Sequence, residues 1–373
     1  MLGSLFGLVG IRGRVALFAG LALLAACGGA RGAPAAPAAP GPPAAPAQGA
    51  APAASQASAA APAPAAAIIP FKTAYTSASA TMSPIWLAVE AGGFAAEGLD
   101  ADLNFIGAGQ AILGALSSEE TPIVVAGANQ VIDANLQGGE YVILGAAIPY
   151  LTTSIFVVPE IETPEQLRGK TVGVSNYGAI SHVALKVALE HWGFEEGRDV
   201  TVVRSGGTPE TLAAMQGGAI AGGAFGAPQS FLARDMGFRE LIDVSTLQYA
   251  MGTASVISTR SYVAAHPDVV ERYLKGLIRG VHAFKTQKDL AVDAIMRYGR
   301  TDDRVGAEKT WDYYRDKFGD DLVMSPRAVE NNLKLMAEEK PEAATAKVEQ
   351  FLDGSFTERI KASGFVEQVK RGG

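Results

Sequence analysis

The chain has one cysteine, Cys27, among its 373 residues. A single cysteine excludes internal disulfides, cysteine-based zinc or iron–sulfur sites, and a thiol nucleophile in the part that follows it. Histidine is almost as scarce, with four in all, and no Ser/His/Asp spacing supports a catalytic triad. We therefore expect no metal, no cofactor and no catalytic residue.

Acidic residues are absent from the first 67 positions, so all 38 lie in 68–373 together with 28 of the 31 basic ones, a formal charge of −10. This balance argues against a nucleic-acid or anionic-membrane surface. Residues 28–67 also lack the apolar side chains of a core, since 35 of these 40 are Ala, Pro or Gly. That composition is typical of an extended, semi-rigid spacer. The folded part is 68–373, long enough for about two domains.

Long hydrophobic runs are missing too, because the longest, 15–26, has twelve residues where a bilayer-spanning helix needs about twenty. With Arg12 and Arg14 before it, this run is typical of a secretory signal. Leu24-Ala25-Ala26-Cys27 resembles the lipobox of bacterial lipoproteins, which implies a signal peptide over 1–26 and lipidation of Cys27. The alternative is an ordinary signal with a chance cysteine. We expect an exported protein, anchored to the periplasmic or extracellular face of a membrane by lipid on Cys27, with 27–67 as its linker.

From residue 71 onward, short β-rich runs alternate with helical patterns, which favours βαβ units and a mainly parallel sheet. Strands are predicted at 71–77, 100–106, 122–127, 141–148, 154–159, 170–175, 199–205, 219–226, 240–245 and 253–259. Helices are predicted at 84–91, 110–117, 129–137, 164–167, 180–192, 208–216, 228–236, 267–286, 289–298, 303–318 and 325–338.

This order predicts an α/β fold of two lobes, each a mostly parallel sheet flanked by helices, with a helical C-terminal tail. We expect 68–158 and 250–373 to form lobe 1 and 159–249 to form lobe 2. The strand at 253–259 would return to lobe 1, and the lobes would hinge near 157–161 and 248–254. Ligands of open α/β sheets bind beyond the carboxyl ends of strands, which places a site between the lobes.

Several stretches resemble the substrate-binding proteins of ABC importers of the nitrate/sulfonate/taurine type. They occur in family order at 84–99, 105–116, 163–174, 177–184, 208–218 and 266–276. The resemblance implies a type II periplasmic-binding fold and, as partners, a small organic solute and the permease and ATPase of an importer. The related thiamine-pyrimidine synthases carry a cysteine-rich motif that this chain lacks.

The sequence departs from the family pattern in lobe 2. Gly218-Ala219-Ile220 lacks the Asp-Ala pair that relatives carry, and Gly226-Ala227-Pro228 replaces a bulky or charged pair before the proline. We expect a roomier, less polar wall here, which disfavours nitrate or a small sulfonate.

The loop 77–83 gathers hydroxyls ahead of a helix, where free N–H groups favour an acceptor or anion. Ser83 is expected to cap the helix, while Ser79 and Thr81 face the ligand. Asn129 either faces the ligand or caps its own helix. The full set of expected ligand-binding residues is Ser79, Thr81, Met82, Gln110, Asn129, Tyr150, Asn176, Tyr177, Ser181, Phe225 and Gln229.

In lobe 2 the loop 175–181 opens a helix, and Ser181 is the strongest candidate donor. Tyr177 either stacks on an organic ligand or covers the loop, and His182 is expected to be a structural hydrogen-bonder. Arg204 either grips a carboxylate or forms a surface ion pair. Trp86 either lines the pocket or lies in the core. The aromatic residues of 303–318 are expected to pack the tail on lobe 1.

These features predict a monomeric solute-binding component of an ABC importer, which captures a small organic, anionic or neutral ligand between two lobes. Two alternatives stay open. One is an enzyme on the same fold, such as a pyrimidine-precursor synthase, and the other is a ligand sensor for a signalling partner.

Overall fold

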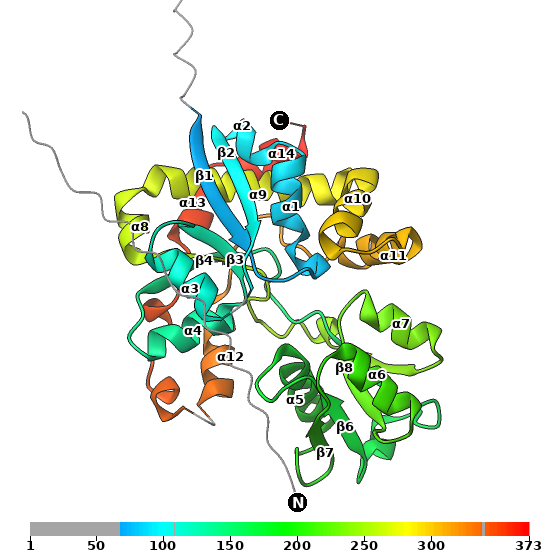
Figure 1. Cartoon of the computed structure of the whole chain (residues 1–373). Helices are drawn as coiled ribbons and strands as arrows, with labels where there is room; N and C mark the ends of the chain where they lie inside the picture. Colours follow the sequence, from blue (N-terminus) through cyan, green and yellow to red (C-terminus); the bar gives the residue numbers. More distant parts are fainter. Residues whose placement is uncertain (1–67, 108, 338–339, 373) are drawn as a thin grey trace, which may run out of the picture. The chain divides into compact units, whose positions relative to one another are not determined.

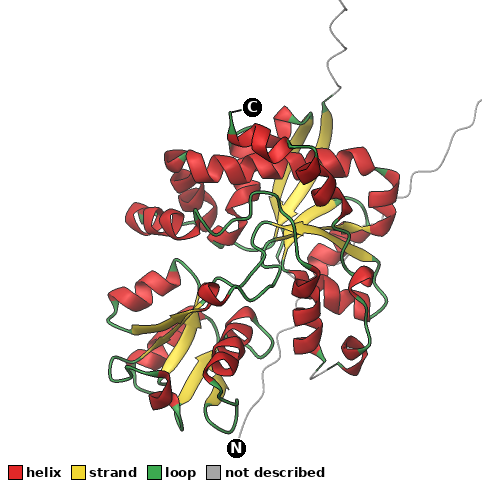
Figure 2. Ribbon diagram, turned by 180° about the vertical axis from the view of Figure 1, so that it is seen from behind, coloured by secondary structure: helices red, strands yellow, loops and turns green. Residues whose placement is uncertain are grey.

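The computed structural model describes residues 68–107, 109–337 and 340–372, all of which belong to one compact unit, Pro64–Gly373. The predicted signal peptide, Cys27 and the linker lie outside the described residues. Two five-stranded sheets form the centre of this unit, and helices cover both faces of each sheet (Figures 1 and 2).

The first sheet has the strand order β2-β1-β3-β10-β4. β1 pairs in parallel with β2 and β3, whereas β10 runs antiparallel between β3 and β4. Its strands are β1 (Ile69–Tyr75), β2 (Leu99–Phe105), β3 (Ile123–Ala126), β4 (Tyr141–Ala146) and β10 (Ser255–Thr259). β10 is the strand that was expected to return to the first lobe.

Successive side chains along these strands point to opposite faces of the sheet, and helices pack on both faces. Phe71, Ile123 and Val125 point into one hydrophobic cluster, and Ala74 and Val124 point into the other. The first face is covered by α1 (Ser83–Glu90), α2 (Gly93–Ala96), α9 (Pro267–Thr286), α10 (Lys288–Gly299), α11 (Arg304–Tyr314), α13 (Ser355–Ala362) and α14 (Phe365–Lys370). The second is covered by α3 (Gln110–Ser117), α4 (Ala128–Leu136) and α12 (Pro326–Met336). α8 (Arg260–Ala265) connects β10 to α9.

The second sheet has the order β7-β6-β8-β5-β9, in which β5 runs antiparallel to β8 and β9. Its strands are β5 (Ser154–Val157), β6 (Thr171–Val174), β7 (Thr201–Arg204), β8 (Gly222–Phe225) and β9 (Arg239–Asp243). The helix α5 (Ile180–Trp192) packs on one face, while α6 (Thr208–Gln216) and α7 (Gln229–Asp235) pack on the other.

Short 3-10 turns complete the chain. They are η1 (Ala80–Met82), η2 (Pro164–Leu167), η3 (Val244–Leu247), η4 (Pro341–Ala344) and η5 (Val348–Gln350).

The strand β5 belongs to the second sheet, although the sequence predicted it in the first. The run at 154–159 was expected to continue the first sheet, yet β5 is a central strand of the second, bonded to β8 and β9 on its two edges. Its four residues are all buried, which a position with helices on both faces requires. The first crossing between the sheets is therefore 147–153, before β5, and not 157–161.

The two crossing segments, 147–153 and 248–254, pair with each other. Leu151 N–H donates to Tyr249 O at 3.1 Å, Met251 N–H to Pro149 O at 2.7 Å and Thr253 N–H to Ile148 O at 3.1 Å. These bonds satisfy the backbone N–H and C=O groups of the two segments, which have no strand partners because they lie between the sheets. The second crossing lies where it was expected.

Candidate functional site

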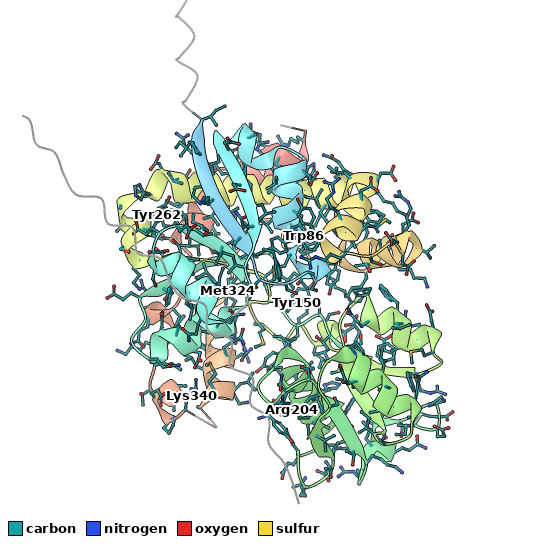
Figure 3. The ribbon with its side chains drawn as sticks, in the orientation of Figure 1. Trp86, Tyr150, Arg204, Tyr262, Met324 and Lys340 are labelled. Carbon is teal, nitrogen blue, oxygen red and sulfur yellow. The ribbon has the colours of Figure 1, made fainter. Side chains whose placement is uncertain are left out.

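The carboxyl ends of the parallel strands bring several loops of both sheets to the crossing segments. In the first sheet β1, β2 and β3 lead into η1, α3 and α4; in the second, β6, β7 and β8 lead into α5, α6 and α7. Parallel neighbours must end on the same edge of their sheet, so the helix N-termini gather there. Tyr150, on the first crossing segment, lies between the two sheets (Figure 3).

A cavity of about 300 Å³ lies at this junction, between α4, α5 and α12. That volume suits a small organic solute. Its lining is Asn129, Gln130, Asp133, Tyr177, Gly178, His182, Val183, Lys186, Met251, Asn332, Leu335, Met336 and Lys340.

Two of the predicted ligand residues, Asn129 and Tyr177, line this cavity. No side-chain cap bond is made at the start of α4, which leaves the cavity-facing alternative for Asn129. The Asn129 Oδ1 atom lies against the backbone of Gly127. A Cβ added to Gly127 would be only 2.6 Å from that oxygen. The Tyr177 hydroxyl donates to Val202 O of β7 at 3.2 Å, which holds this side chain against the neighbouring strand.

Ser181 and Ser175 form a hydroxyl pair at the start of α5. Ser175 N–H donates to Ser181 Oγ at 3.0 Å, and the two Oγ atoms are 2.8 Å apart. One of the two hydroxyl hydrogens joins the pair, which leaves the other hydrogen for an external acceptor. This arrangement orients Ser181 without using up its hydrogen-bonding capacity.

His182 is held at both ring nitrogens. Gly178 N–H donates to Nδ1 at 2.9 Å, and Nε2 lies 2.9 Å from Glu196 Oε2. An Nδ1 that accepts places the hydrogen on Nε2, which donates to Glu196. This network matches the expected structural role of His182.

The hydroxyls of loop 77–83 do not take the expected roles. Ser79, predicted to face the ligand, caps η1 by accepting from Thr81 N–H at 3.4 Å. Ser83, predicted as the cap, is the first residue of α1, and its buried Oγ has no hydrogen-bond partner. The prediction for Ser83 is wrong because the 3-10 turn η1 precedes α1, so the chain is already helical there.

The other predicted residues are spread over both lobes. Thr81 and Met82 are buried, and Phe225 packs on Phe156 in the core at a ring distance of 6.1 Å. Gln110 lies in a groove between α3 and α4, while Asn176 and Gln229 are exposed at the starts of α5 and α7. Burial raises the pKa of Tyr150, so its hydroxyl is neutral near neutral pH.

The α12 side of the cavity had no signal in the sequence. Asn332, Leu335 and Met336 come from the helix predicted at 325–338 in the tail, for which the sequence predicted no ligand contact. Asp133 of α4 pairs with Lys340 just after α12, which ties this tail helix to the site. Figure 1 shows α12 beside α4.

α11 contacts the second lobe as well as the first. Trp311, Tyr314 and Phe318 lie in the first-lobe core, as expected. Tyr313 and Lys317 instead reach Asp243 at the end of β9, and Lys317 Nζ donates to Ser245 Oγ at 2.7 Å. Burial and then the Asp243 carboxylate raise the pKa of Tyr313 far above its usual range, so its O–H donates to that carboxylate.

The roomier wall predicted at Gly226-Ala227-Pro228 is wrong at Ala227. Ala227 is 2% exposed and belongs to the same cluster as Tyr314 of α11. The small side chain leaves space that a tyrosine from the other lobe fills. Arg204 ends the edge strand β7 and is exposed, with no ion pair to a described residue (Figure 3).

Comparison with known families decides the relationship. A family model described as NMT1/THI5-like matches residues 79–290, more than half of the chain. The chain belongs to the NMT1/THI5-like family. None of the curated protein sequences matches it.

Solved structures similar to this NMT1/THI5-like chain are periplasmic binding proteins. The aliphatic sulphonate binding protein SsuA from Escherichia coli has 17% identity and a TM-score of 0.63, over 75% of this chain and 91% of that one. SsuA from Xanthomonas axonopodis pv. citri, bound to MOPS, has 19% identity and a TM-score of 0.57, over 76% of this chain and 96% of that one. The nitrate-binding protein NrtA from Synechocystis PCC 6803 has 13% identity and a TM-score of 0.58, over 79% of this chain and 89% of that one.

These likenesses confirm the predicted fold, two α/β lobes of the periplasmic-binding type with a helical C-terminal region. Within the described part of this NMT1/THI5-like chain, no group of three His, Cys, Asp or Glu could hold a metal ion. In the same part, no helix is both long and apolar enough to cross a bilayer.

Proposed function

We propose that this protein is the extracytoplasmic solute-binding component of an ABC importer. It would capture a small organic solute between its lobes and deliver it to a permease and its ATPase. The observation that carries the proposal is the cavity of about 300 Å³, lined by helices of both lobes beside the paired crossing segments. Rotation about those segments would open and close it.

Binding rather than catalysis fits the groups that line the cavity. Its one histidine, His182, is engaged at both ring nitrogens by Gly178 and Glu196, so neither nitrogen is available as a general base. The remaining polar lining consists of the amides of Asn129, Gln130 and Asn332, the Tyr177 hydroxyl, Lys186, and the ion pair between Asp133 and Lys340. Such groups orient a ligand by hydrogen bonds and by charge.

The sequence adds a location to this proposal. We expect the signal over 1–26 to direct export and Cys27 to be lipidated. With a spacer over 27–67, this would hold a monomeric receptor at the membrane surface, near its permease. More than one acyl chain gives stable anchoring where a single chain is marginal.

A thermal-shift screen of the full chain, purified in detergent, tests the function. The ligands are sulfonates, nitrate, aromatic carboxylates, pyrimidines and amino acids. A ligand at one hundred times its dissociation constant should stabilise the folded state by about 2.7 kcal/mol, because it binds only that state. A folded protein whose midpoint none of these classes raises would contradict the proposal.

The variant Ser181→Ala then tests whether the solute reaches the start of α5, where Ser181 precedes the cavity-lining His182. Loss of one hydroxyl donor to a bound solute should weaken affinity about tenfold, which corresponds to about 1.4 kcal/mol. Ser363→Ala is the matched control, because the Ser363 hydroxyl bonds only to nearby backbone groups, donating to Ile360 O and accepting from Phe365 N–H. Equal affinities of the two variants would place the solute elsewhere.

A further inference from the structure

Tyr75 and Phe105, the last residues of β1 and β2, form an aromatic cluster with Trp86 of α1 and Tyr298 of α10. The Tyr75 ring lies 5.4 Å from Phe105, 5.6 Å from Trp86 and 5.9 Å from Tyr298, and Trp86 stacks on Tyr298 at 5.0 Å. Three of these side chains are shielded, but Phe105 is 49% exposed. Phe105 therefore presents an open aromatic surface at the edge of the loops where ligands of this fold class bind.

Arg300 lies over this surface, with its guanidinium carbon 5.8 Å from the centre of the Phe105 ring. It forms no ion pair with any described residue, whereas Arg297, one turn earlier, is paired with Glu90. The charge of Arg300 acts on the Tyr75 hydroxyl. Burial raises the pKa of this hydroxyl, and the positive charge of Arg300 offsets part of that rise. The cation is thus exposed, uncompensated and next to aromatic rings.

The backbone at Arg300 is also unusual for its residue type. It ends α10 in the left-handed region, at φ +54° and ψ +50°, where glycine or asparagine is preferred. The preceding Gly299 lies against loop 76–79, with Ala78 O 3.7 Å from the position of an added Cβ. This geometry brings the α10–α11 turn to the loop that follows β1.

Net charge makes an isolated arginine matter here. The folded part carries −10, so an anion approaching it is repelled unless a local positive charge compensates. In the strand order β2-β1-β3, Phe105 and the start of α4 are two strand spacings apart, about 10 Å. A solute with a ring on Phe105 could therefore extend toward Asn129.

We propose that Arg300 selects an organic anion with a flat apolar body: its guanidinium holds the carboxylate or sulfonate and Phe105 carries the ring. This inference rests on the proposed solute-binding function and adds the class of solute. A planar guanidinium can donate two parallel hydrogen bonds to either oxyanion, which favours it over a lysine at such a position.

Isothermal titration with two matched pairs of probes tests the inference on the full chain. The anions are benzoate and benzenesulfonate, and their neutral counterparts are benzamide and benzenesulfonamide. The wild type should bind each anion at least tenfold more tightly than its neutral counterpart. Arg300→Gln should lose that preference and leave the neutral probes within twofold of the wild type.

Arg297→Gln is the control, because it removes the same charge three residues away on the same helix, where Glu90 already neutralises it. It should keep the anion preference, which separates a contact at Arg300 from a general change in net charge. Anion binding that Arg300→Gln leaves intact overturns the inference.

The two proposals fail separately. A wild type that binds solutes of the thermal-shift screen but neither aromatic anion keeps its receptor function and loses the role assigned to Arg300. A wild type that binds no solute in either assay overturns both.

Discussion

Close packing of α1 against α9 explains the glycine at position 280. A Cβ there would lie 2.2 Å from Pro84 O and 2.6 Å from Ala88 N, both backbone atoms that cannot move aside. At Gly276, one turn earlier, it would meet the Phe94 ring at 2.4 Å. A side chain at position 280 would push α9 away from α1, and one at position 276 would push it away from α2.

Gly280→Ala should lower the free energy of unfolding by about 2 kcal/mol, because the added methyl forces α1 and α9 apart. Urea unfolding followed by circular dichroism measures the change. Gly114→Ala in α3 is the matched control, since nothing lies within 4 Å of its added Cβ. It should gain about 0.4–1 kcal/mol through a stiffer unfolded chain. Equal losses in both variants would refute the packing argument.

At single residues the sequence predicted chemistry better than orientation. A cluster of hydroxyls before a helix was recognisable at Ser79 and Ser83, but which of them caps depended on whether η1 preceded α1. Trp86 was left open between pocket and core, and it is fully buried. Arg300 had no signal, because its place beside Phe105 joins residues almost two hundred positions apart.

Among the elements, α11 carries the contacts that connect the tail to the second lobe. Lys309 pairs with Asp235 of α7 at 3.4 Å, and the Tyr313 ring meets Phe231 edge-on at 6.0 Å. Lys317, one turn beyond Tyr313, reaches Asp243 and Ser245. A hinge motion that separates the lobes would have to break this row.

Lys317→Met should speed amide hydrogen exchange in η3 severalfold, because Ser245 and Asp243 lose a partly buried charged partner. Exchange followed by mass spectrometry reports on this segment directly. Arg315→Met is the control, since Arg315 pairs with its exposed neighbour Asp316. If η3 exchanges at the same rate in both variants, Lys317 does not stabilise the contact.

Element type was predictable along most of the folded part, and sheet membership was not. The helix at 267–286 matches α9, and the helix at 180–192 matches α5, because long apolar stripes fix both. β5 reads as an apolar strand in either sheet, so its local pattern could not reveal which neighbours it would bond. Only the pairing with β8 and β9 decided that.

At the scale of the whole molecule, the proposed signal peptide and lipid anchor would determine where the folded part works. The proposal of a tethered receptor rests on Cys27, which follows the apolar run of the signal. The experiment that bears on it needs no ligand, because lipidation changes mass and membrane association by itself.

Cys27→Ser, expressed in a bacterial host, should move the protein from the membrane fraction to the soluble exported fraction, since serine has no thiol to accept a diacylglycerol. Fractionation with mass spectrometry of the N-terminal peptide measures both effects. Ser55→Ala in the spacer should stay with the membrane. Retention of Cys27→Ser in the membrane fraction would exclude the lipid anchor.

The sequence by itself determined the class of fold, through its local periodicity, and the family, through motifs in family order. The signal peptide, the lipidated Cys27 and the spacer stay predictions. The tertiary structure decided the partner of β5, the contribution of α12 to the cavity, the bridge made by α11 and the position of Arg300. Each of these depends on contacts between distant segments, whose geometry is set by packing of the whole unit and not by the residues on either side.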